Sequence, residues 1–599
     1  MFQSVPHMLF NTIEKYPAKI ALQFKRGGSL KHYTYVEFGE KIQHLTHGLA
    51  VVGLQPGDKI AILSNNRPEW AIADFASLSL RAVVVPIYQT LPANQIAYIL
   101  NDSETRAIFV ENEEQYNKIA EIKSKLPGLE FIFTFQPIDD NEQGLKTFQE
   151  LIELGQAHRQ ENPGFFDQSL DAIESNEICS MVYTSGTTGN PKGVMLHHKG
   201  FITDIVNADA RLNIQESDIF LSFLPLSHLY ERLAGHWTPM YKGATIHYSQ
   251  SIETVIDDLA EARPTVIVSV PRLFEKVAAR VVEQVEHSSP VKRKIFYWAL
   301  RTGRTYHDQK IDGKLGFIMK RRYKLADKLV FQKIKQKLGG RLRYPIAGGA
   351  PLAVDTLKFF ESLDMQIIEG YGMTETHLII TLTPFGKSRY GSCGKPIEGV
   401  EVKIADDGEV LVRGITVMAG YFKRPDWTAE VIDKDGWLHT GDVGHLDEEN
   451  YLYLTDRKKN IIITSSGKNI ASAPIENRIK ASKYIEEICL IGNNRKFICA
   501  LVVPNFEAVQ KWAKQHRIDY FDNKELVEHQ DVKNLLWHEV DYYQRDFARF
   551  EKIKKIAILS EPFSIDKGEL TPSLKIKRNV VEEHYKHLID KIYQTDHVI

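Results

Sequence analysis

Cysteine is scarce in this sequence: its 599 residues contain four, and no two of them form a CxxC pair. Such sparse cysteines argue against a disulfide framework and a zinc site, and they favour a reducing cytoplasm. A large excess of one sign of charge is also lacking, because 75 Lys and Arg nearly balance 77 Asp and Glu. Without a global positive field, we expect no nucleic acid partner.

Long apolar runs are missing too. The longest stretch without a charged residue, 82–101, contains Pro86, Pro92, Asn94 and Gln95, so it is too polar and broken for a membrane-spanning helix. Residues 1–17 mix Gln, Asn, Glu and Lys with apolar residues and have no signal-peptide core. We therefore expect a cytoplasmic protein that is soluble or peripheral to a membrane.

The composition is otherwise that of a globular protein, and its length predicts at least two domains. Helical spacing over 38–49 alternates with short apolar runs such as 60–63, 265–270 and 366–368, which is typical of α/β layers. We predict a large α/β domain over 1–456. The β-rich runs 485–491 and 497–503, followed by charged amphipathic helices, predict a smaller α+β domain over 457–599.

One segment differs from the rest in charge. Residues 290–343 contain seventeen Lys or Arg against three Asp, a net charge of +14, with apolar residues interleaved. That pattern is typical of basic amphipathic helices on an anionic membrane surface. The alternative is a solvated helical insertion whose apolar stripe packs on its own domain.

The strongest motif is MVYTSGTTGNPKGVML at 181–196. Its glycines let backbone N–H groups converge, its hydroxyls add donors and Lys192 adds positive charge, so the expected ligand is a polyphosphate. The spacing is not that of a Walker loop, in which a helix begins at the lysine. Here the apolar run 194–196 predicts a strand, which gives strand, loop, strand.

The motif resembles the phosphate-binding signature of the adenylate-forming superfamily, which includes acyl-CoA synthetases, luciferases and peptide-synthetase adenylation domains. The resemblance implies a layered N-terminal α/β domain and a smaller, mobile α+β C-terminal domain. It also implies that one run of residues binds the phosphates of ATP. These residues are Thr184, Ser185, Gly186, Thr187, Thr188, Gly189 and Lys192.

Further motifs extend the resemblance along the chain. Residues 224–232 (LPLSHLYER) are similar to the segment that borders the acyl pocket in long-chain acyl-CoA synthetases, where His228 would gate the carboxylate. Two other motifs look like the adenine-binding strand ends, where small residues and an aromatic ring suit a flat base. Their residues are Gly348, Gly349, Ala350, Tyr371, Gly372, Met373 and Thr374.

The resemblance also implies a magnesium site and a ribose site. Glu375 matches the carboxylate that holds Mg²⁺, with Thr184 nearby, and a bridging cation is what a carboxylate beside a triphosphate requires. Asp442 and Arg457 match the positions that bind the ribose hydroxyls. Lys459 falls at the position where the resemblance implies an interdomain hinge.

Two motifs near the C-terminus complete the set. Residues 465–470 resemble the loop that meets the pantetheine arm of coenzyme A, with Gly467 and Lys468 as its contacts, although Ser466 stands where long-chain enzymes usually have Gly. Residues 570–578 resemble the catalytic-lysine motif, in which Lys575 reaches the α-phosphate and the acyl carboxylate. Lys577 is the second choice.

The resemblance therefore implies an ATP-dependent long-chain fatty acid–CoA ligase. It would form an acyl-adenylate with Mg²⁺ and release pyrophosphate, then pass the acyl group to coenzyme A. Two alternatives remain open at this stage: a fatty acyl-AMP ligase that loads a carrier protein, and an inactive lipid-binding homologue. Nothing in the sequence fixes the preferred chain length or the oligomeric state.

Overall fold

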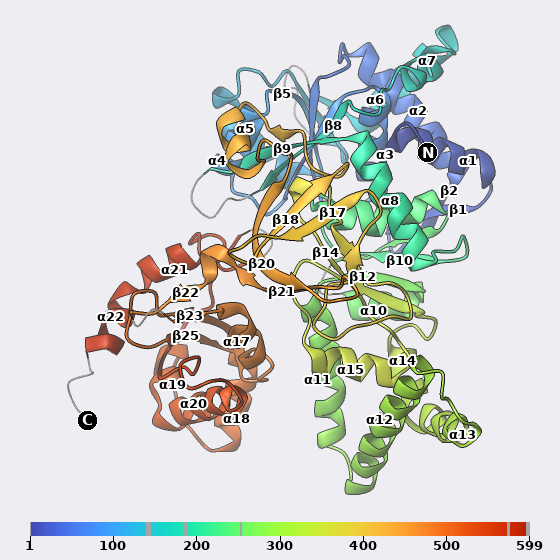
Figure 1. The fold of residues 1–599 in the computed structure, drawn as a ribbon. Helices are drawn as coiled ribbons and strands as arrows, with labels where there is room; N and C mark the ends of the chain where they lie inside the picture. The colour runs from blue at the N-terminus through green and yellow to red at the C-terminus, as the bar shows by residue number, and fades with distance from the viewer. Residues whose placement is uncertain are drawn as a thin grey trace. The chain divides into compact units, whose positions relative to one another are not determined.

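The computed structural model describes residues 2–138, 145–184, 190–251, 254–465, 468–571 and 575–594 (Figure 1). By internal contacts the chain divides into two compact units. The first comprises Met1–Lys403, Leu411–His439 and Asp447–Leu452, and the second comprises Ile404–Val410, Thr440–Leu446 and Tyr453–Ile599. This division does not coincide with the predicted domain boundary after residue 456, which stays a prediction.

Eight of the described strands form a mixed sheet in the first unit. Its central strands are parallel and buried on both faces, which explains their continuous apolar sequences. In spatial order the strands are β19 (Gly420–Tyr421), β9 (Lys192–His197), β8 (Ile178–Thr184), β4 (Val83–Ile87), β3 (Lys59–Leu63), β5 (Thr105–Val110), β6 (Phe131–Thr134) and β7 (Leu145–Thr147).

A second sheet of the first unit has nine described strands, parallel from β11 through β10, β12 and β13 to β14. In spatial order they are β16 (Lys395–Pro396), β15 (Thr381–Leu382), β14 (Ile368–Tyr371), β13 (Tyr344–Ala347), β12 (Val266–Ser269), β10 (Ile219–Ser222), β11 (Thr245–Tyr248), β1 (Ile20–Arg26) and β2 (Ser29–Thr34). The strand expected over 366–368 instead begins at Ile368 and continues to Tyr371, because 366 and 367 still belong to the loop before it.

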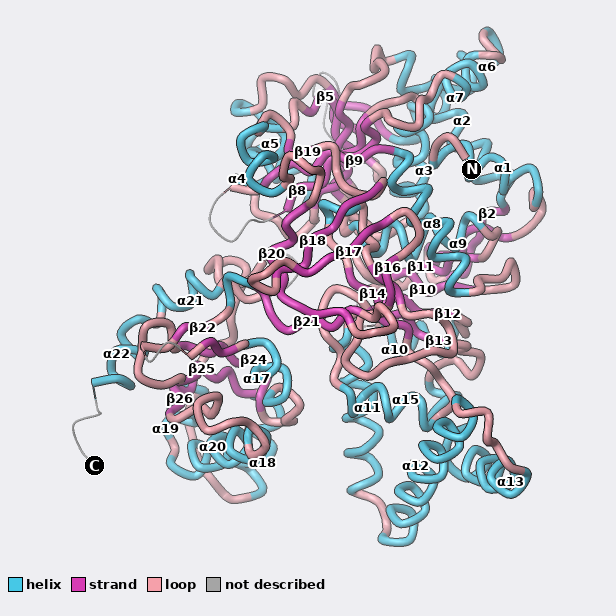
Figure 2. Tube along the Cα trace, viewed as in Figure 1, coloured by secondary structure: helices cyan, strands magenta, loops and turns pink. Residues whose placement is uncertain are grey.

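Helices cover these sheets and also form a region of their own. They are α1 (Val5–Lys15), α2 (Tyr35–Val51), α3 (Pro68–Ser79), α4 (Ala93–Asp102), α5 (Glu113–Ile122), α6 (Phe148–Glu161), α7 (Phe165–Asp171), α8 (His198–Leu212), α9 (Thr238–Tyr241), α10 (Val255–Ala262), α11 (Pro271–Glu286), α12 (Pro290–Ile311), α13 (Phe317–Ala326), α14 (Gln332–Lys337), α15 (Val354–Ser362) and α16 (Pro425–Val431). Figure 2 shows that α11, α12 and α13 lie together as helices and loops without strands. The basic segment falls within this helical region.

The second unit has its own core. A three-stranded sheet of β24 (Ile485–Ile491), β25 (Cys499–Pro504) and β26 (Lys555–Ile558) packs with helices into two apolar clusters. The helices are α17 (Ser472–Ile479), α18 (Phe506–Gln515), α19 (Asn523–Glu528), α20 (Gln530–Gln544), α21 (Arg578–His584) and α22 (Lys586–Gln594).

The remaining strands form small sheets. A four-stranded sheet has the order β17 (Val400–Ile404), β18 (Glu409–Gly414), β20 (Leu438–Leu446) and β21 (Leu452–Arg457), and β22 (Ile462–Ile463) pairs with β23 (Asn469–Ile470). The mixed α/β class, with a large N-terminal part and a separate C-terminal one, is confirmed.

Candidate functional site

The predicted phosphate loop joins two adjacent strands of the eight-stranded sheet. β8 ends at Thr184, β9 begins at Lys192, and these two residues are paired in the antiparallel register. The arrangement on either side of the loop is therefore strand, loop, strand, as the sequence predicts. The loop residues Ser185, Gly186, Thr187, Thr188 and Gly189 lie outside the described residues.

Two aromatic rings hold the Lys192 side chain. Its ammonium lies 4.8 Å from the ring centroid of Tyr421 and 4.7 Å from that of Trp427. Tyr421 lies on β19, opposite Val194 of β9, and Trp427 lies on α16. Cation–π attraction of this kind holds the ammonium between the two rings, and the residue is half-buried.

Glu375 shares one of these rings. It lies in a short turn after β14, where its main-chain carbonyl accepts a hydrogen bond from the Met418 N–H at 2.8 Å. The Tyr421 hydroxyl donates a hydrogen bond to Glu375 Oε1 at 3.0 Å. Burial and the Glu375 carboxylate raise the pKa of Tyr421, which keeps the phenol protonated as a donor. The same tyrosine thus contacts the predicted phosphate lysine and the predicted magnesium ligand.

The carboxylate oxygens of Glu375 suit a magnesium ion as ligands. Within the described residues, no group of three or more His, Cys, Asp or Glu side chains could enclose a metal ion. Mg²⁺ does not need such a cage, because it usually binds one or two carboxylates together with substrate phosphates and water. A half-buried carboxylate, kept in place by Tyr421, fits that requirement.

The loop after Glu375 is fixed by buried polar groups. His377 adopts a left-handed conformation with φ of 58°, its Nδ1 donates to the Thr416 carbonyl oxygen at 2.7 Å, and its Nε2 accepts from the His197 N–H at 3.0 Å. The buried Asp204 carboxylate accepts a hydrogen bond from the Ile379 N–H at 3.0 Å. These bonds tie the Glu375 turn to the end of β9 and to α8.

His228 lies in the segment that follows β10. The Tyr230 N–H donates to its Nδ1 at 3.0 Å, and the ring of Tyr88, which follows β4, lies 6.3 Å from the His228 ring. The Asn66 side chain holds the start of this segment: it donates to the Leu224 carbonyl oxygen at 2.6 Å and accepts from the Leu226 N–H at 2.8 Å.

The predicted adenine positions follow the carboxyl ends of β13 and β14. Gly348 directly follows β13, and a Cβ atom there would lie 2.9 Å from the Tyr230 ring. A Cβ atom at Gly372 would lie 1.3 Å from the Leu378 carbonyl oxygen, so only glycine fits. Sheets of parallel strands typically bind ligands at the carboxyl ends of the strands. The segment that contains His228 follows β10 and the predicted adenine positions follow β13 and β14, so both lie at this edge of the sheet. The other residues of this set are Gly349, Ala350, Tyr371, Met373 and Thr374.

Three predicted residues come together within the second unit. Arg457 Nε lies 3.1 Å from Asp442 Oδ1, with Asp442 buried and Arg457 half-exposed. Lys575 adjoins this pair: desolvation by the surrounding protein and then the positive charge of Arg457 lower the pKa of its ammonium, while Asp442 raises it. The Lys575 residue still reaches solvent, and its N–H donates to Thr571 Oγ1 at 3.0 Å.

Comparison with known proteins identifies the family of the chain. Residues 9–422 match the model of the AMP-binding enzyme family, and residues 459–597 match that of the AMP-binding enzyme C-terminal domain. The chain belongs to the AMP-binding enzyme family. It is 33% identical to the long-chain-fatty-acid–CoA ligase FadD15 of Mycobacterium bovis over 99% of this chain and 97% of that protein. It is 32% identical to the long-chain-fatty-acid–CoA ligase ACSBG2 of Xenopus laevis over 98% of this chain and 83% of the relative.

Solved structures share the fold of this AMP-binding enzyme. The anthranilate CoA ligase AuaEII, in complex with anthranoyl-AMP, has a TM-score of 0.74 at 19% identity and 98% coverage of both chains. The adenylation domain of a carboxylate reductase from Mycobacterium chelonae has a TM-score of 0.73 at 21% identity, covering 99% of this chain and 91% of that one. The predicted adenylate-forming fold is confirmed.

Two further predicted positions of this AMP-binding enzyme lie in the second unit. Lys459, the predicted hinge, is exposed in a short turn after β21. Lys468, the predicted coenzyme A contact, is exposed beside β23, and its ammonium lies 5.7 Å from the ring centroid of Phe550. Gly467 lies outside the described residues. No comparison tests the roles predicted for these residues.

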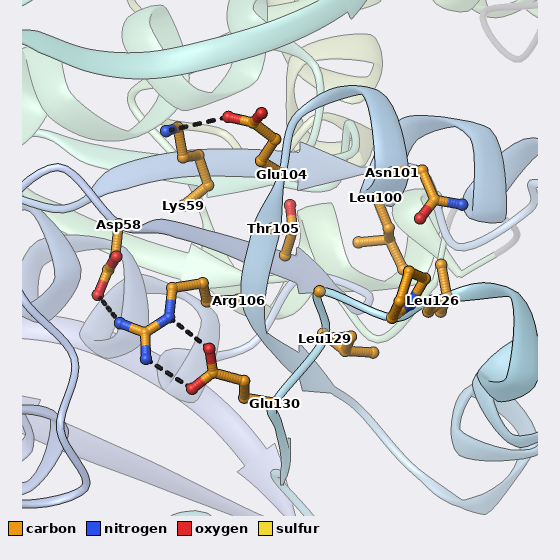
Figure 3. A pocket seen from close by; sticks show the side chains of 12 residues that line it. Asp58, Lys59, Leu100, Asn101, Glu104, Thr105, Arg106, Leu126, Leu129 and Glu130 are labelled. Carbon is orange, nitrogen blue, oxygen red and sulfur yellow. Dashed lines mark hydrogen bonds and ion pairs between the residues drawn. The ribbon is translucent and has the colours of Figure 1, made fainter.

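A hollow of about 460 Å³ in this AMP-binding enzyme is not part of the predicted site (Figure 3). It opens at the amino ends of β3, β5 and β6, whereas Thr184 ends β8 at the carboxyl edge of the same sheet. Its charges pair with one another: Arg106 lies 2.5 Å from both Asp58 and Glu130, and Lys59 lies 3.9 Å from Glu104. Separately, none of the helices in the described ranges combines the length and the apolar character that crossing a bilayer requires.

Sequence reasoning missed the residues that support the site. Tyr421, Trp427, Asn66, His377 and Asp204 belong to none of the motifs taken from the sequence as binding positions. One signal was available for Tyr421 and Trp427, because three aromatic residues occur within the eight residues GYFKRPDW at 420–427, beside turn-forming and basic residues. Their pairing with Lys192 becomes visible only once β19 is placed beside β9.

Proposed function

We propose that this chain is a long-chain fatty acid–CoA ligase. It joins a fatty acid to ATP as an acyl-adenylate, releases pyrophosphate, and then transfers the acyl group to coenzyme A. The observation that carries the proposal is the cluster in which Tyr421 contacts both Lys192 and Glu375. The long-chain substrate class rests on the relatives named for it, which match nearly the whole chain.

Charge repulsion is the chemical problem in the first step. A fatty carboxylate and the α-phosphate of ATP are both anionic, and at an effective dielectric near 20 two unit charges about 4 Å apart repel by about 4 kcal/mol. Positive groups placed in advance lower that barrier. We assign Lys192 to the outer phosphates and Lys575 to the α-phosphate and the carboxylate. The carboxylate oxygen then attacks phosphorus, and pyrophosphate leaves.

Glu375 is the residue that would hold a magnesium ion, with the Thr184 hydroxyl as an additional ligand. When bound, the ion would neutralise charge on the phosphates. The chain's own contribution is to orient the carboxylate: Tyr421 donates to one of its oxygens, and the Met418 N–H fixes the backbone of the turn.

The other predicted residues bind the ribose, the adenine, the fatty acid and coenzyme A. Asp442 accepts hydrogen bonds from the two ribose hydroxyls, since a carboxylate matches a vicinal diol, and Arg457 orients Asp442. The adenine lies against Tyr371 and the glycine-rich strand ends. His228 gates the carboxylate at the acyl pocket, and Lys468 contacts the pantetheine arm together with Gly467.

The two half-reactions are served by one active site. We propose that residues 457–599 act as a mobile C-terminal domain that turns about Lys459 after adenylation. The turn withdraws Lys575 and admits the coenzyme A thiol, whose sulfur attacks the acyl carbonyl and displaces AMP. The proposal also includes a cytoplasmic location, with peripheral contact of residues 290–343 at the inner face of an anionic membrane.

A substrate panel tests the function. Purified protein is given ATP, Mg²⁺, coenzyme A and acids from acetate to C20, and acyl-CoA and AMP are measured. We expect thioester to form with long-chain acids and AMP release to require free coenzyme A. Adenylate formation without any thioester would point to a carrier-loading enzyme, and absence of pyrophosphate release with oleate would point to an inactive lipid-binding homologue.

A further inference from the structure

α13 has two faces that differ in their surroundings. Tyr323 and Ala326 on one face are buried in an apolar cluster with Phe296 and Phe331, and α13 packs beside α12. Figure 1 shows α12 and α13 next to each other at the edge of the helical region. Packing on its own domain, the alternative to membrane binding, therefore accounts for this face of the helix.

The opposite face carries large apolar side chains in solvent. Phe317 is 67% exposed, Ile318 74%, Leu325 51%, and Leu329, in the next turn, 45%. Successive helical residues are about 100° apart, so Phe317, Ile318 and Leu325 lie on the side away from Tyr323. Exposed apolar residues gathered on one element mark a surface that binds something.

α13 and the turn after it also carry unpaired positive charge. Lys320, Arg321, Arg322, Lys324 and Lys328 are exposed, and across the part of the chain that the structure describes none of them forms an ion pair with an acidic residue. No acidic residue occurs between 313 and 326.

Two other lysines of the basic segment, residues 290–343, do form ion pairs. Lys310 lies 2.6 Å from Asp364, and Lys335 lies 2.9 Å from Asp327. Arg321 instead lies over the Phe317 ring at 4.5 Å. On α13, positive charge without acidic partners therefore lies beside exposed apolar side chains.

We propose that this outer face of α13 docks on an anionic phospholipid bilayer. Phe317, Ile318, Leu325 and Leu329 enter the interface between headgroups and acyl chains, and the surrounding Lys and Arg side chains contact the lipid phosphates. The charge complementarity selects lipid, because the exposed apolar residues are accompanied by basic residues without acidic partners. The advantage of docking rests on the proposed function: long-chain fatty acids dissolve in bilayers, and an enzyme docked there would bind them from the bilayer.

Co-sedimentation with vesicles tests the docking. The full chain should bind mixed phosphatidylcholine–phosphatidylglycerol vesicles and bind pure phosphatidylcholine weakly. Replacing Arg321, Arg322 and Lys324 together by Gln should weaken binding about a hundred-fold, because each basic residue near an anionic surface contributes about five-fold. The matched control replaces Lys514, Lys524 and Lys533 by Gln, three exposed lysines of the second unit, and should bind like the parent.

A second pair of variants tests the insertion of apolar side chains. Phe317→Ser should remove the part of the binding that survives high salt, whereas Phe521→Ser, at a side chain 95% exposed in the second unit, should not. A fluorophore on Ile318→Cys should be quenched by brominated lipids, and one on Phe521→Cys should not. Equal binding by the α13 variants and their controls would overturn the proposal, and so would failure of the parent to bind anionic vesicles, which would leave an acidic protein as the occupant.

Activity separates this proposal from the proposed function. With fatty acid supplied in solution, the Arg321, Arg322 and Lys324 variant should form thioester at the parent rate, and with fatty acid supplied in anionic vesicles it should be slower. Absence of thioester under both conditions in the parent would refute the ligase assignment while leaving vesicle binding intact. Equal rates for parent and variant on vesicles would overturn the role of α13.

Discussion

Two lysines from different parts of the molecule are assigned to different phosphates of ATP, and their surroundings differ. Lys192 begins a strand inside the eight-stranded sheet and is held by the rings of Tyr421 and Trp427. Lys575 belongs to the smaller unit, keeps access to solvent, and is faced by the like charge of Arg457.

The difference indicates that Lys192 is a fixed positive charge, whereas Lys575 is a positive charge that the smaller unit brings to the substrate. Sheet pairing sets the position of Lys192, so it should contribute whenever ATP is bound. The position of Lys575 depends on the unit that carries it, so it should contribute only during adenylation. Variants at the two lysines should therefore affect the two half-reactions differently.

The largest expected effect comes from Lys575→Ala. Removing a preorganised positive group from the transition state should slow acyl-adenylate formation about 10²–10³-fold. Thioester formation from supplied acyl-adenylate should stay near the parent rate. Pyrophosphate exchange measures the first step and acyl-CoA production the second. Lys577→Ala is the matched control, and equal loss in both steps for Lys575→Ala would contradict the delivered charge.

A loss of about 10²-fold is expected for Lys192→Gln in kcat/KM for ATP, because one charge-assisted contact to phosphate, about 1.5–3 kcal/mol, is removed. The loss should appear in KM more than in kcat, since a fixed cation binds ground state and transition state alike. Initial rates at varied ATP concentration measure it, with the exposed Lys31→Gln as control. An unchanged KM for ATP would remove Lys192 from the phosphate site.

Tyr421→Phe should cost less, about ten-fold in kcat/KM. The variant keeps the ring under Lys192 but deletes the hydrogen bond to Glu375 Oε1, and a hydrogen bond to a charged group contributes about 1.5–3 kcal/mol. The Mg²⁺ concentration needed for half-maximal rate should rise. Tyr542→Phe, at an exposed tyrosine, serves as control. A normal Mg²⁺ dependence would show that Tyr421 does not position Glu375.

The smallest effect concerns pH. Lys575 must be protonated to act, and desolvation together with Arg457 lowers its pKa, so adenylation should decline with rising pH earlier than an ordinary lysine would require. Arg457→Gln removes the repulsion and should move this alkaline limb of kcat to higher pH. Asp442→Asn removes the favourable charge and should move it to lower pH. Shifts in the same direction for both variants would refute the assignment of the limb to Lys575.

Local patterns in the sequence were sufficient for much of the fold. The glycine-rich motif with its flanking apolar runs predicted strand, loop, strand, and β8 and β9 have this arrangement because both runs are largely buried and pair with each other in the sheet. The run 485–491 coincides with β24. The strand expected over 366–368 was displaced, because apolar character alone does not show where pairing with β13 begins.

The contacts that complete the site could not be predicted, because they depend on pairing between distant segments. Tyr421 reaches Lys192 only through the pairing of β19 with β9. His377 takes its role from a left-handed backbone and from Gly200, where a Cβ atom would lie 2.4 Å from its ring. The sequence could not predict which face of α13 is buried and which is exposed, because an amphipathic basic sequence does not show which side of the helix the domain covers.

The most direct test of the central claim is a crystal structure with a non-hydrolysable acyl-adenylate analogue. The account predicts the Lys575 Nζ within hydrogen-bond distance of the α-phosphate, about 2.7–3.2 Å, while Lys192 stays over Tyr421 and Trp427. An α-phosphate contacted by Lys577, or by no lysine from residues 457–599, would contradict it.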